Sequence, residues 1–249
     1  MYLSISNIIR KKILEITHLK KAGHVASNLS IVDILVVLYK DFIKKKNQNQ
    51  FILSKGHACL SLYCVLSYFK YFSNNFLKKF GDNNSILMCH ISHRVPGVWV
   101  STGSLGHGLP IAAGKAFVSR KNKIYVLLSD GELNEGSNWE AFLFIAHHNL
   151  KNIKIIIDSN KIQSIDFVKN VINMEPMIDK FKSFGFFVSS INGHNHQDLK
   201  KTINKTTSKP HIIIANTIKG KGVKFMENSI LWHYRPPNEN EVKLAIENL

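Results

Sequence analysis

Residues 127–164 read LLSDGELNEGSNWEAFLFIAHHNLKNIKIIIDSNKIQS, and this stretch decides how the rest of the chain is interpreted. A short apolar run ends in Asp130-Gly131-Glu132, and a second run, one helix length later, ends in Asp158-Ser159-Asn160. Both runs have the continuous apolar character of strands buried on both faces of a parallel sheet. Because such sheets bind ligands at the carboxyl ends of their strands, Asp130 and Asn160 are expected to project into one crevice.

The sequence on either side repeats this alternation of short apolar runs and amphipathic segments. Strands are predicted at 50–54, 123–129, 153–158, 186–191 and 211–217, and helices at 5–20, 31–43 (with Ser30 as N-cap), 57–72, 106–121, 137–149 and 195–206. We find no linker composition and no internal repeat. The pattern therefore predicts one α/β domain over residues 1–249, with a mainly parallel sheet covered by helices on both faces.

The net charge of +16 raises the question of a nucleic-acid partner. Of the 33 basic residues only four are arginine, namely Arg10, Arg94, Arg120 and Arg235. Arginine is the residue that makes bidentate phosphate contacts, and it is scarce here. The composition therefore does not favour a dedicated nucleic-acid binder, although an attraction to anionic metabolites remains in keeping with it.

Cysteine usage and hydropathy indicate the compartment. The chain has three cysteines, Cys59, Cys64 and Cys89. An odd number of cysteines without a CxxC pair favours a reducing environment. The N-terminal segment has no uninterrupted apolar stretch of the kind that a signal peptide needs, and no apolar run approaches the roughly 20 residues of a membrane span. We expect a cytoplasmic protein without a membrane partner.

The two strand ends carry the residue types of a hard-cation site. An Asp carboxylate and an Asn carbonyl are ligands for Mg²⁺ or Ca²⁺ rather than for zinc. Gly131 lacks a side chain where a ligand has to approach the backbone, and the helix that follows directs its N-terminus toward an anion. The segment therefore suggests a divalent cation that bridges a diphosphate. The competing interpretation is ordinary turn chemistry, since Asp-Gly and Asp-Ser-Asn also begin loops.

Beyond these residues, SDGELNEG and DSNKI resemble the thiamine diphosphate motif, in which Asn follows an Asp-Gly pair after about thirty residues; Asp130 and Asn160 are thirty positions apart. Ser129 stands where many such motifs have Gly. Four further blocks resemble the transketolase family in the family's order: AGHVASNLSIVDIL (22–35), FILSKGHACLSLY (51–63), VPGVWVSTGSLGHGLPIAAGKA (95–116) and IKGKGVKFMENSILWHYRPPNE (218–239). The resemblance implies the thiamine diphosphate-binding fold, here its diphosphate-binding domain.

The resemblance also implies a role for each matching position. Asp130, Asn160 and the carbonyl of Ile162 would coordinate Mg²⁺ (or Ca²⁺). The cofactor-binding set would comprise His57, Gly103, Ser104, Leu105, Asp130, Gly131, Glu132, Asn160, Ile162 and His233. The catalytic set would comprise His24, His57 and His90 at the substrate entrance, together with His233, which with His57 would reach the diphosphate region. Glu135 would lie near the subunit interface.

The remaining histidines have several interpretations. His93 is an alternative to His90, because MCHISHRVPG departs from the family's usual wording in this block. His107, at the start of a predicted helix, is expected to be structural. The His147-His148 pair and the His194/His196 pair suggest zinc, but the sequence supplies no matching second pair.

The resemblance covers only the diphosphate-binding part of a transketolase. It implies the N-terminal subunit of a split enzyme that assembles with a separate subunit carrying the pyrimidine-binding and C-terminal domains, as two copies of each. The implied reaction moves a two-carbon ketol unit from a ketose to an aldose, which are usually phosphorylated. Two alternatives stay open: half of another thiamine diphosphate enzyme with a different sugar or keto substrate, and a non-catalytic remnant that binds the cofactor.

Overall fold

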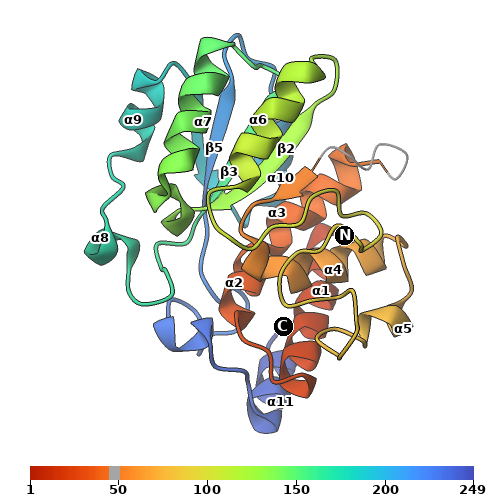
Figure 1. Cartoon of the computed structure of the whole chain (residues 1–249). Helices are drawn as coiled ribbons and strands as arrows, with labels where there is room; N and C mark the ends of the chain where they lie inside the picture. Colours follow the sequence, from red (N-terminus) through yellow and green to blue (C-terminus); the bar gives the residue numbers. More distant parts are fainter. Residues whose placement is uncertain (45–50) are drawn as a thin grey trace.

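A single five-stranded parallel sheet forms the centre of the computed structural model, which describes residues 1–44 and 51–249 (Figure 1). The strands are β1 (Phe51–Leu53), β2 (Ile124–Ser129), β3 (Ile153–Ser159), β4 (Phe187–Asn192) and β5 (His211–Asn216). Their spatial order is β1-β2-β3-β5-β4, and every neighbouring pair is parallel. The predicted parallel α/β sheet is confirmed, although residue 50 of the first predicted strand lies outside the described residues.

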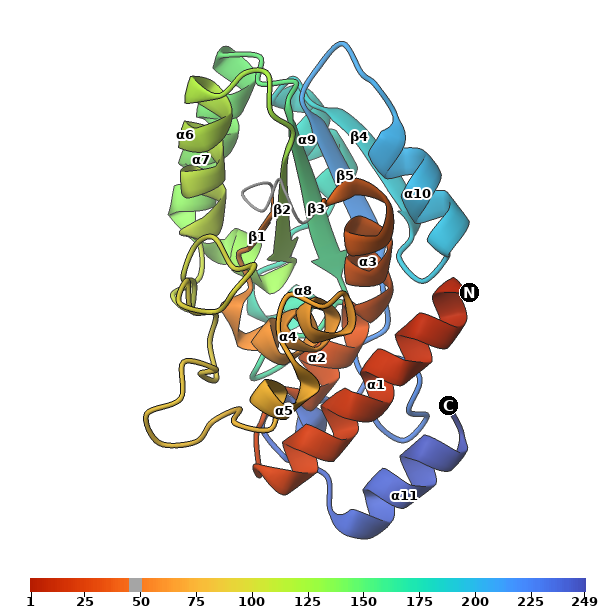
Figure 2. The same cartoon turned by 90° about the vertical axis from the view of Figure 1, so that its right-hand side faces the viewer.

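Both faces of the sheet are buried, because successive strand residues point into two separate cores. On β2, Tyr125 and Leu127 belong to one core, whereas Val126 and Leu128 belong to the other. The first core is covered by α1 (Tyr2–Leu19), α3 (Val32–Val37), α4 (Cys59–Tyr68) and α10 (His196–Asn204), and the second by α6 (Gly108–Val118), α7 (Gly136–His147) and α9 (Met177–Ser183). Figure 2 shows α6 and α7 on one side of the sheet and α3 and α10 on the other.

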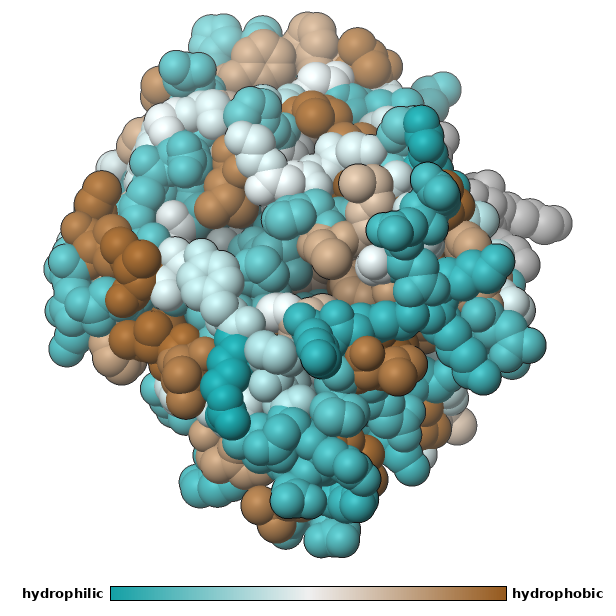
Figure 3. Space-filling view, turned by 60° about the horizontal axis from the view of Figure 1, so that its bottom comes forward, coloured by the Kyte–Doolittle hydropathy of each residue, from teal (hydrophilic) through white to brown (hydrophobic). Residues whose placement is uncertain are grey.

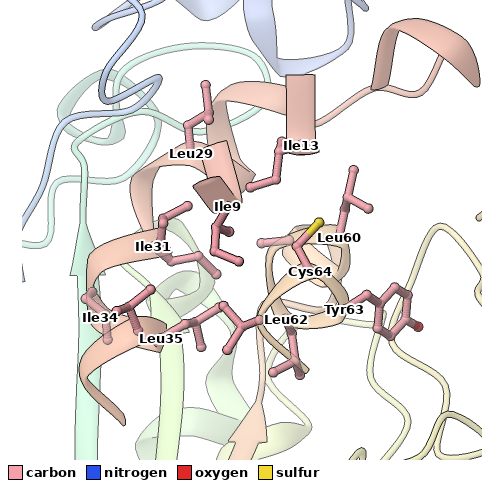
Figure 4. Close-up of a cluster of buried hydrophobic side chains, with 14 of the residues drawn as sticks. Ile9, Ile13, Leu29, Ile31, Ile34, Leu35, Leu60, Leu62, Tyr63 and Cys64 are labelled. Carbon is pink, nitrogen blue, oxygen red and sulfur yellow. The ribbon is translucent and has the colours of Figure 1, made fainter. Parts of the chain in front are cut away.

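The first core is the larger one and is dominated by branched aliphatic side chains. Side chains from α1, α3 and α4 converge there, among them Ile9, Leu35 and Leu62 (Figure 4). Each of these three residues is at most 2% exposed. Full burial of one such side chain contributes roughly 1.5–3 kcal/mol, so this packing stabilises the helices against the sheet.

The second predicted helix begins earlier than the sequence indicated. The chain enters α2 (Val25–Ser30), turns at Ile31 with φ −100° and ψ 0°, and continues through α3 into a π-helical turn, η1 (Leu38–Phe42). Ser30 is therefore the last residue of α2 and not an N-cap. Its hydroxyl donates instead to the Asp158 carboxylate at 2.7 Å, a contact between distant segments that local pattern does not reveal.

Several short elements were not predicted. They are α5 (Asn74–Leu77), α8 (Val168–Val171), α11 (Glu239–Glu247) and the single-turn helices η3 (Gly56–Ala58), η4 (Gly131–Asn134) and η5 (Ile230–His233), together with α9. Most of them span fewer than eight residues, too few for a clear periodic signal. In the described part of the chain, no helix combines the length and the hydropathy that crossing a membrane requires.

Candidate active site

A cavity of about 220 Å³ lies at the carboxyl ends of β1, β2 and β3. Figure 3 brings this end of the molecule forward, and residues coloured teal, white and pale brown lie together near the centre of the view. Most of the predicted site residues line the cavity: His24, His57, His90, Gly103, Leu105, Asp130, Gly131, Glu132, Asn160, Ile162 and His233. The fold therefore collects residues from 24 to 233 in one place.

Asp130 follows β2 directly and is 1% exposed. Its carboxylate accepts hydrogen bonds from the backbone N–H groups of Gly131 at 2.8 Å and Lys161 at 2.6 Å. Burial and the nearby charge of Asp158 raise the pKa of Asp130 to about 6. A buried carboxylate that is held only moderately by backbone donors gains from an additional positive charge, which a bound cation would supply.

Asn160 follows β3 and is oriented by Asp158, its neighbour but one in sequence. The Asn160 amide donates to Asp158 at 2.9 Å, and its carbonyl oxygen accepts from the N–H of Ile162 at 3.1 Å. Asp158 is fully buried and forms an ion pair with Lys55 at 2.5 Å. This pair neutralises both charges and fixes which end of the Asn160 amide faces the cavity.

Four imidazoles lie close together at the cavity. The ring centroid of His24 lies 5.3 Å from that of His57, 6.1 Å from that of His90 and 5.0 Å from that of His233. Burial, reinforced by neighbouring basic groups, lowers the pKa of His24 to about 4 and that of His233 to about 3, and lowers the pKa of His57 as well. At neutral pH these three rings are uncharged, so each offers one hydrogen-bond donor and one acceptor.

Glu132 ties the glycine-rich loop 103–106 to the ends of two strands. Its carboxylate accepts from the Ser54 hydroxyl at 2.5 Å, from the N–H of Gly106 at 2.9 Å and from the N–H of Ser129 at 3.3 Å. Glu132 is fully buried, and burial raises its pKa. Its contacts position the loop, so Glu132 acts on the cavity through Gly106 and its neighbours.

Lys219 enters the cavity from the loop that follows β5. Its ammonium group donates to the carbonyls of Ile162 and Gln163, both at 3.0 Å, and contacts His233 Nδ1 at 2.8 Å. Burial, followed by the charge of Lys55, lowers the pKa of Lys219 to about 7. Because a carbonyl oxygen carries two lone pairs, the bond to Lys219 does not exclude Ile162 from a metal's ligand set.

The donor set at Asp130, Asn160 and Ile162 fits a hard divalent cation. It offers one carboxylate, one amide oxygen and one backbone carbonyl, which is an all-oxygen set. Gly131 lies beside this donor set and packs against Gln163, whose side chain an added Cβ would approach to 2.7 Å, so a substitution there would displace a residue that lines the cavity.

Some predicted residues do not line the cavity. Ser104 is exposed, and Glu135 packs beside Gly106, whose added Cβ would lie 2.6 Å from the Glu135 Cβ. His93 contacts Ser101 at 2.8 Å, whereas His90 packs against Gly103 and faces His24. The geometry thus puts His90 rather than His93 at the cavity.

The histidine pairs that suggested zinc lie elsewhere. Within residues 1–44 and 51–249, no three His, Cys, Asp or Glu side chains are grouped to hold a metal ion. His194 and His196 both contact Asp33 instead. The predicted magnesium ligands are one Asp, one Asn and one backbone carbonyl, and so they do not form a cluster of three such side chains. The absence of a cluster therefore bears on the zinc interpretation and leaves the magnesium prediction open.

Sequence reasoning missed several lining residues: Ser27, Lys55, Ser129, Gln163, Ser164, Lys219 and Tyr234. Lys55 and Lys219 matter most, because they carry charge. Both stand in blocks that were quoted for the family resemblance, SKGH and IKGKG. Lys55 directly follows the predicted strand 50–54, and Lys219 stands two positions after the predicted strand 211–217, which was a usable signal. Lysine is ordinarily a surface residue, so this signal is weak by itself.

Comparison with known proteins agrees with this geometry. Residues 3–249 match the family model for the transketolase thiamine diphosphate-binding domain. The chain is 40% identical to a subunit of apulose-4-phosphate transketolase from Actinobacillus succinogenes, covering 97% of this chain and 93% of that protein. It is 34% identical to a subunit of 6-deoxy-6-sulfo-D-fructose transketolase from a Clostridium species, covering 98% and 94%.

The fold of the chain is also similar to that of solved transketolase structures. Transketolase from Campylobacter jejuni superimposes with a TM-score of 0.89 at 31% identity, over 99% of this chain but only 42% of that one. The chain thus spans about two fifths of that transketolase and almost the whole length of the relative from Actinobacillus succinogenes. It belongs to the transketolase family and corresponds to that family's thiamine diphosphate-binding domain.

Proposed function

We propose that this chain is the N-terminal subunit of a split transketolase that moves a two-carbon ketol unit from a ketose phosphate to an aldose phosphate. The observation that carries the proposal is the cavity in which Asp130 and Asn160 meet beside three uncharged imidazoles. The near full-length similarity to two proteins named as transketolase subunits supports it.

Mg²⁺ is the proposed metal, bound by Asp130, Asn160 and the carbonyl of Ile162. Ca²⁺ also takes oxygen ligands and is the natural substitute. The ion would bridge this side of the cavity to the diphosphate of the cofactor. Lys55 and Lys219 line the same cavity, so their positive charges offset the diphosphate's negative charge.

When bound, thiamine diphosphate supplies the electron sink for breaking and forming a carbon–carbon bond beside a carbonyl. The chain's own residues bind and orient. Gly103 and Leu105 form the wall against which the cofactor would lie, and Gly131 lets the diphosphate approach the backbone. His24, His57 and His90 would surround the entrance, where imidazole rings hydrogen-bond a sugar's carbonyl and hydroxyl groups and hold or pass a proton.

Metal affinity should fall in mildly acidic solution. Asp130 must be ionised to bind the ion, and its pKa is about 6, so affinity should drop about tenfold per pH unit below that value. Lys219, with a pKa of about 7, acts in the same direction, because its proton repels a cation. Titration with Mn²⁺, followed by paramagnetic resonance at pH 5.0, 6.0 and 7.5, measures this. An affinity that stays constant across these values would contradict the assignment of Asp130.

A partner chain is part of the proposal, because the cavity is small. Sites that enclose a whole drug-sized ligand typically measure roughly 300–1,000 Å³, and this one measures about 220 Å³. A second subunit, with pyrimidine-binding and C-terminal domains, would enclose the remainder of the cofactor. Two copies of each subunit are expected.

The partner requirement predicts that the chain alone has no turnover. The purified chain should show no ketol transfer with thiamine diphosphate, Mg²⁺, a ketose phosphate and an aldose phosphate. Addition of the partner subunit, expressed from the source genome, should restore turnover. Robust activity without the partner would refute the split-subunit proposal.

The same assay addresses the substrate. Relatives are named for apulose 4-phosphate and for 6-deoxy-6-sulfofructose, so both sugars belong in the donor panel. Turnover with a sugar outside the common phosphates would favour a specialised thiamine diphosphate enzyme. Cofactor binding by the reconstituted pair without turnover on any donor would favour the non-catalytic alternative.

A further inference from the structure

The loop that carries Lys219 into the cavity, residues 217–222, is held from outside the cavity on both sides of that lysine. The N–H of Ile218 donates to His194 Nε2 at 2.8 Å. Arg10 Nε donates to the carbonyl of Lys221 at 3.0 Å. Neither His194 nor Arg10 lines the cavity, so their contacts fix the backbone of the loop while its lysine side chain faces inward.

Both of these contacts lead to one buried carboxylate, Asp33 on α3. Its Oδ2 atom accepts from Arg10 at 2.5 Å and from His194 Nδ1 at 2.8 Å, while its Oδ1 atom contacts His196 at 3.0 Å. Asp33 is 2% exposed. Burial alone would raise the pKa of Asp33, but the hydrogen bonds from both histidines and the charge of Arg10 outweigh it and hold that pKa below its usual range.

The geometry determines how His194 is protonated. A backbone N–H can only donate, so the Nε2 atom of His194 must be the acceptor in its contact with Ile218. The ring hydrogen therefore sits on Nδ1, where it is donated to Asp33. Asp33 selects the one tautomer of His194 that can hold the loop, as carboxylates orient histidines in metal sites.

The backbone before His194 approaches the same loop closely. An added Cβ at Gly193 would lie 2.5 Å from the Thr217 side chain and 3.1 Å from Ala215. The turn after β4 is thus built to lie against the end of β5. This second observation, independent of the hydrogen bonds, shows that the turn and the loop are fitted to each other.

We propose that Asp33 is a positioning residue for the cofactor site: through His194 and Arg10 it fixes Ile218 and Lys221, and so places the Lys219 ammonium group where a diphosphate binds. The proposal rests on the function proposed above. The loop has several further anchors: Thr217 donates to Asp158, the N–H of Gly220 donates to Ala26 at 3.0 Å, and the carbonyl of Lys219 accepts from the N–H of Asn228 at 2.9 Å. Loss of the Asp33 contacts should therefore loosen the loop without unfolding it.

Four variants of the full chain separate positioning from general stability. His194→Asn removes the ring nitrogen that accepts from Ile218, and Asp33→Asn removes the carboxylate that selects the tautomer of His194 able to accept that bond. His194→Gln places a side-chain oxygen near the former Nε2 position and should restore an acceptor for Ile218. His196→Asn is the matched control, because it removes a contact to Asp33 from a histidine that does not touch the loop.

Two readouts apply, with inorganic pyrophosphate and Mg²⁺ as the probe. Amide hydrogen exchange of residues 217–222 should accelerate in Asp33→Asn and His194→Asn, and stay near the parent rate in His194→Gln and His196→Asn. Pyrophosphate affinity should follow the same ranking, falling about tenfold in the first two variants.

The outcomes distinguish this proposal from the proposed function. Unchanged exchange and affinity in His194→Asn would overturn the positioning role, and so would equal losses in His194→Asn and His196→Asn. If the parent chain and its reconstituted complex bind no pyrophosphate, the proposed function fails, while the exchange of residues 217–222 still decides whether Asp33 positions the loop.

Discussion

Replacing Asp130 with asparagine should strongly weaken Mg²⁺-dependent binding of thiamine diphosphate without lowering the thermal stability of the empty chain. Loss of one partner in a buried charge pair typically costs 2–5 kcal/mol, so affinity should fall about 100-fold. Stability should hold, because asparagine removes a carboxylate whose pKa burial has raised to about 6 and retains an acceptor for a backbone N–H.

Calorimetric titration of the reconstituted complex measures the affinity, and a thermal melt of the free chain measures the stability. Asp166→Asn is the control, because Asp166 also accepts a backbone N–H, from Phe167, but lies outside the cavity. Undiminished binding in Asp130→Asn would remove Asp130 from the metal's ligands. A lower melting temperature would mean that the carboxylate has a structural role.

Gly108→Ala should destabilise the fold and loosen the site at the same time. Gly108 begins α6 and packs directly on the end of β1, where an added Cβ would lie 2.7 Å from the Ser54 Cα. Such overpacking typically costs about 1–3 kcal/mol. The Ser54 hydroxyl also donates to Glu132, so displacing Ser54 would disturb the contact that holds the loop 103–106.

Gly114→Ala supplies the matched control for this substitution. Gly114 lies in the same helix, and an added Cβ there meets nothing within 4 Å. Since alanine favours a helix over glycine by about 1 kcal/mol, this variant should be more stable than the parent. Urea denaturation measures both. If both variants shift stability in the same direction, close packing of Gly108 on β1 is not the cause.

The central strands could be predicted from the sequence, because β2 and β3 are buried at every position and consist mostly of apolar residues. The runs at 123–129 and 153–158 coincide closely with β2 and β3. The order of the strands could not be predicted, since β5 lies between β3 and β4 through contacts between distant segments. Ser30 was misplaced for the same reason: its hydroxyl partner, Asp158, is 128 positions away.

The candidate site could be predicted where its polar residues stand just after a predicted strand. Asp130 and Asn160 were found because parallel strands present their carboxyl ends at one edge. Lys55 and Lys219 were not found, because a buried lysine depends on partners that only the fold supplies. Lys55 pairs with the Asp158 carboxylate, and Lys219 donates to the backbone carbonyls of Ile162 and Gln163.

The position of the last strand has a consequence for how the chain acquires its site during synthesis. β5 ends at Asn216, so all five strands have left the ribosome before Lys219 and His233 do. The described strands are therefore complete before the cavity has its full complement of charged and aromatic groups. A chain cut just after Asn216 would keep these five strands while losing Lys219, His233 and Tyr234 from the cavity lining.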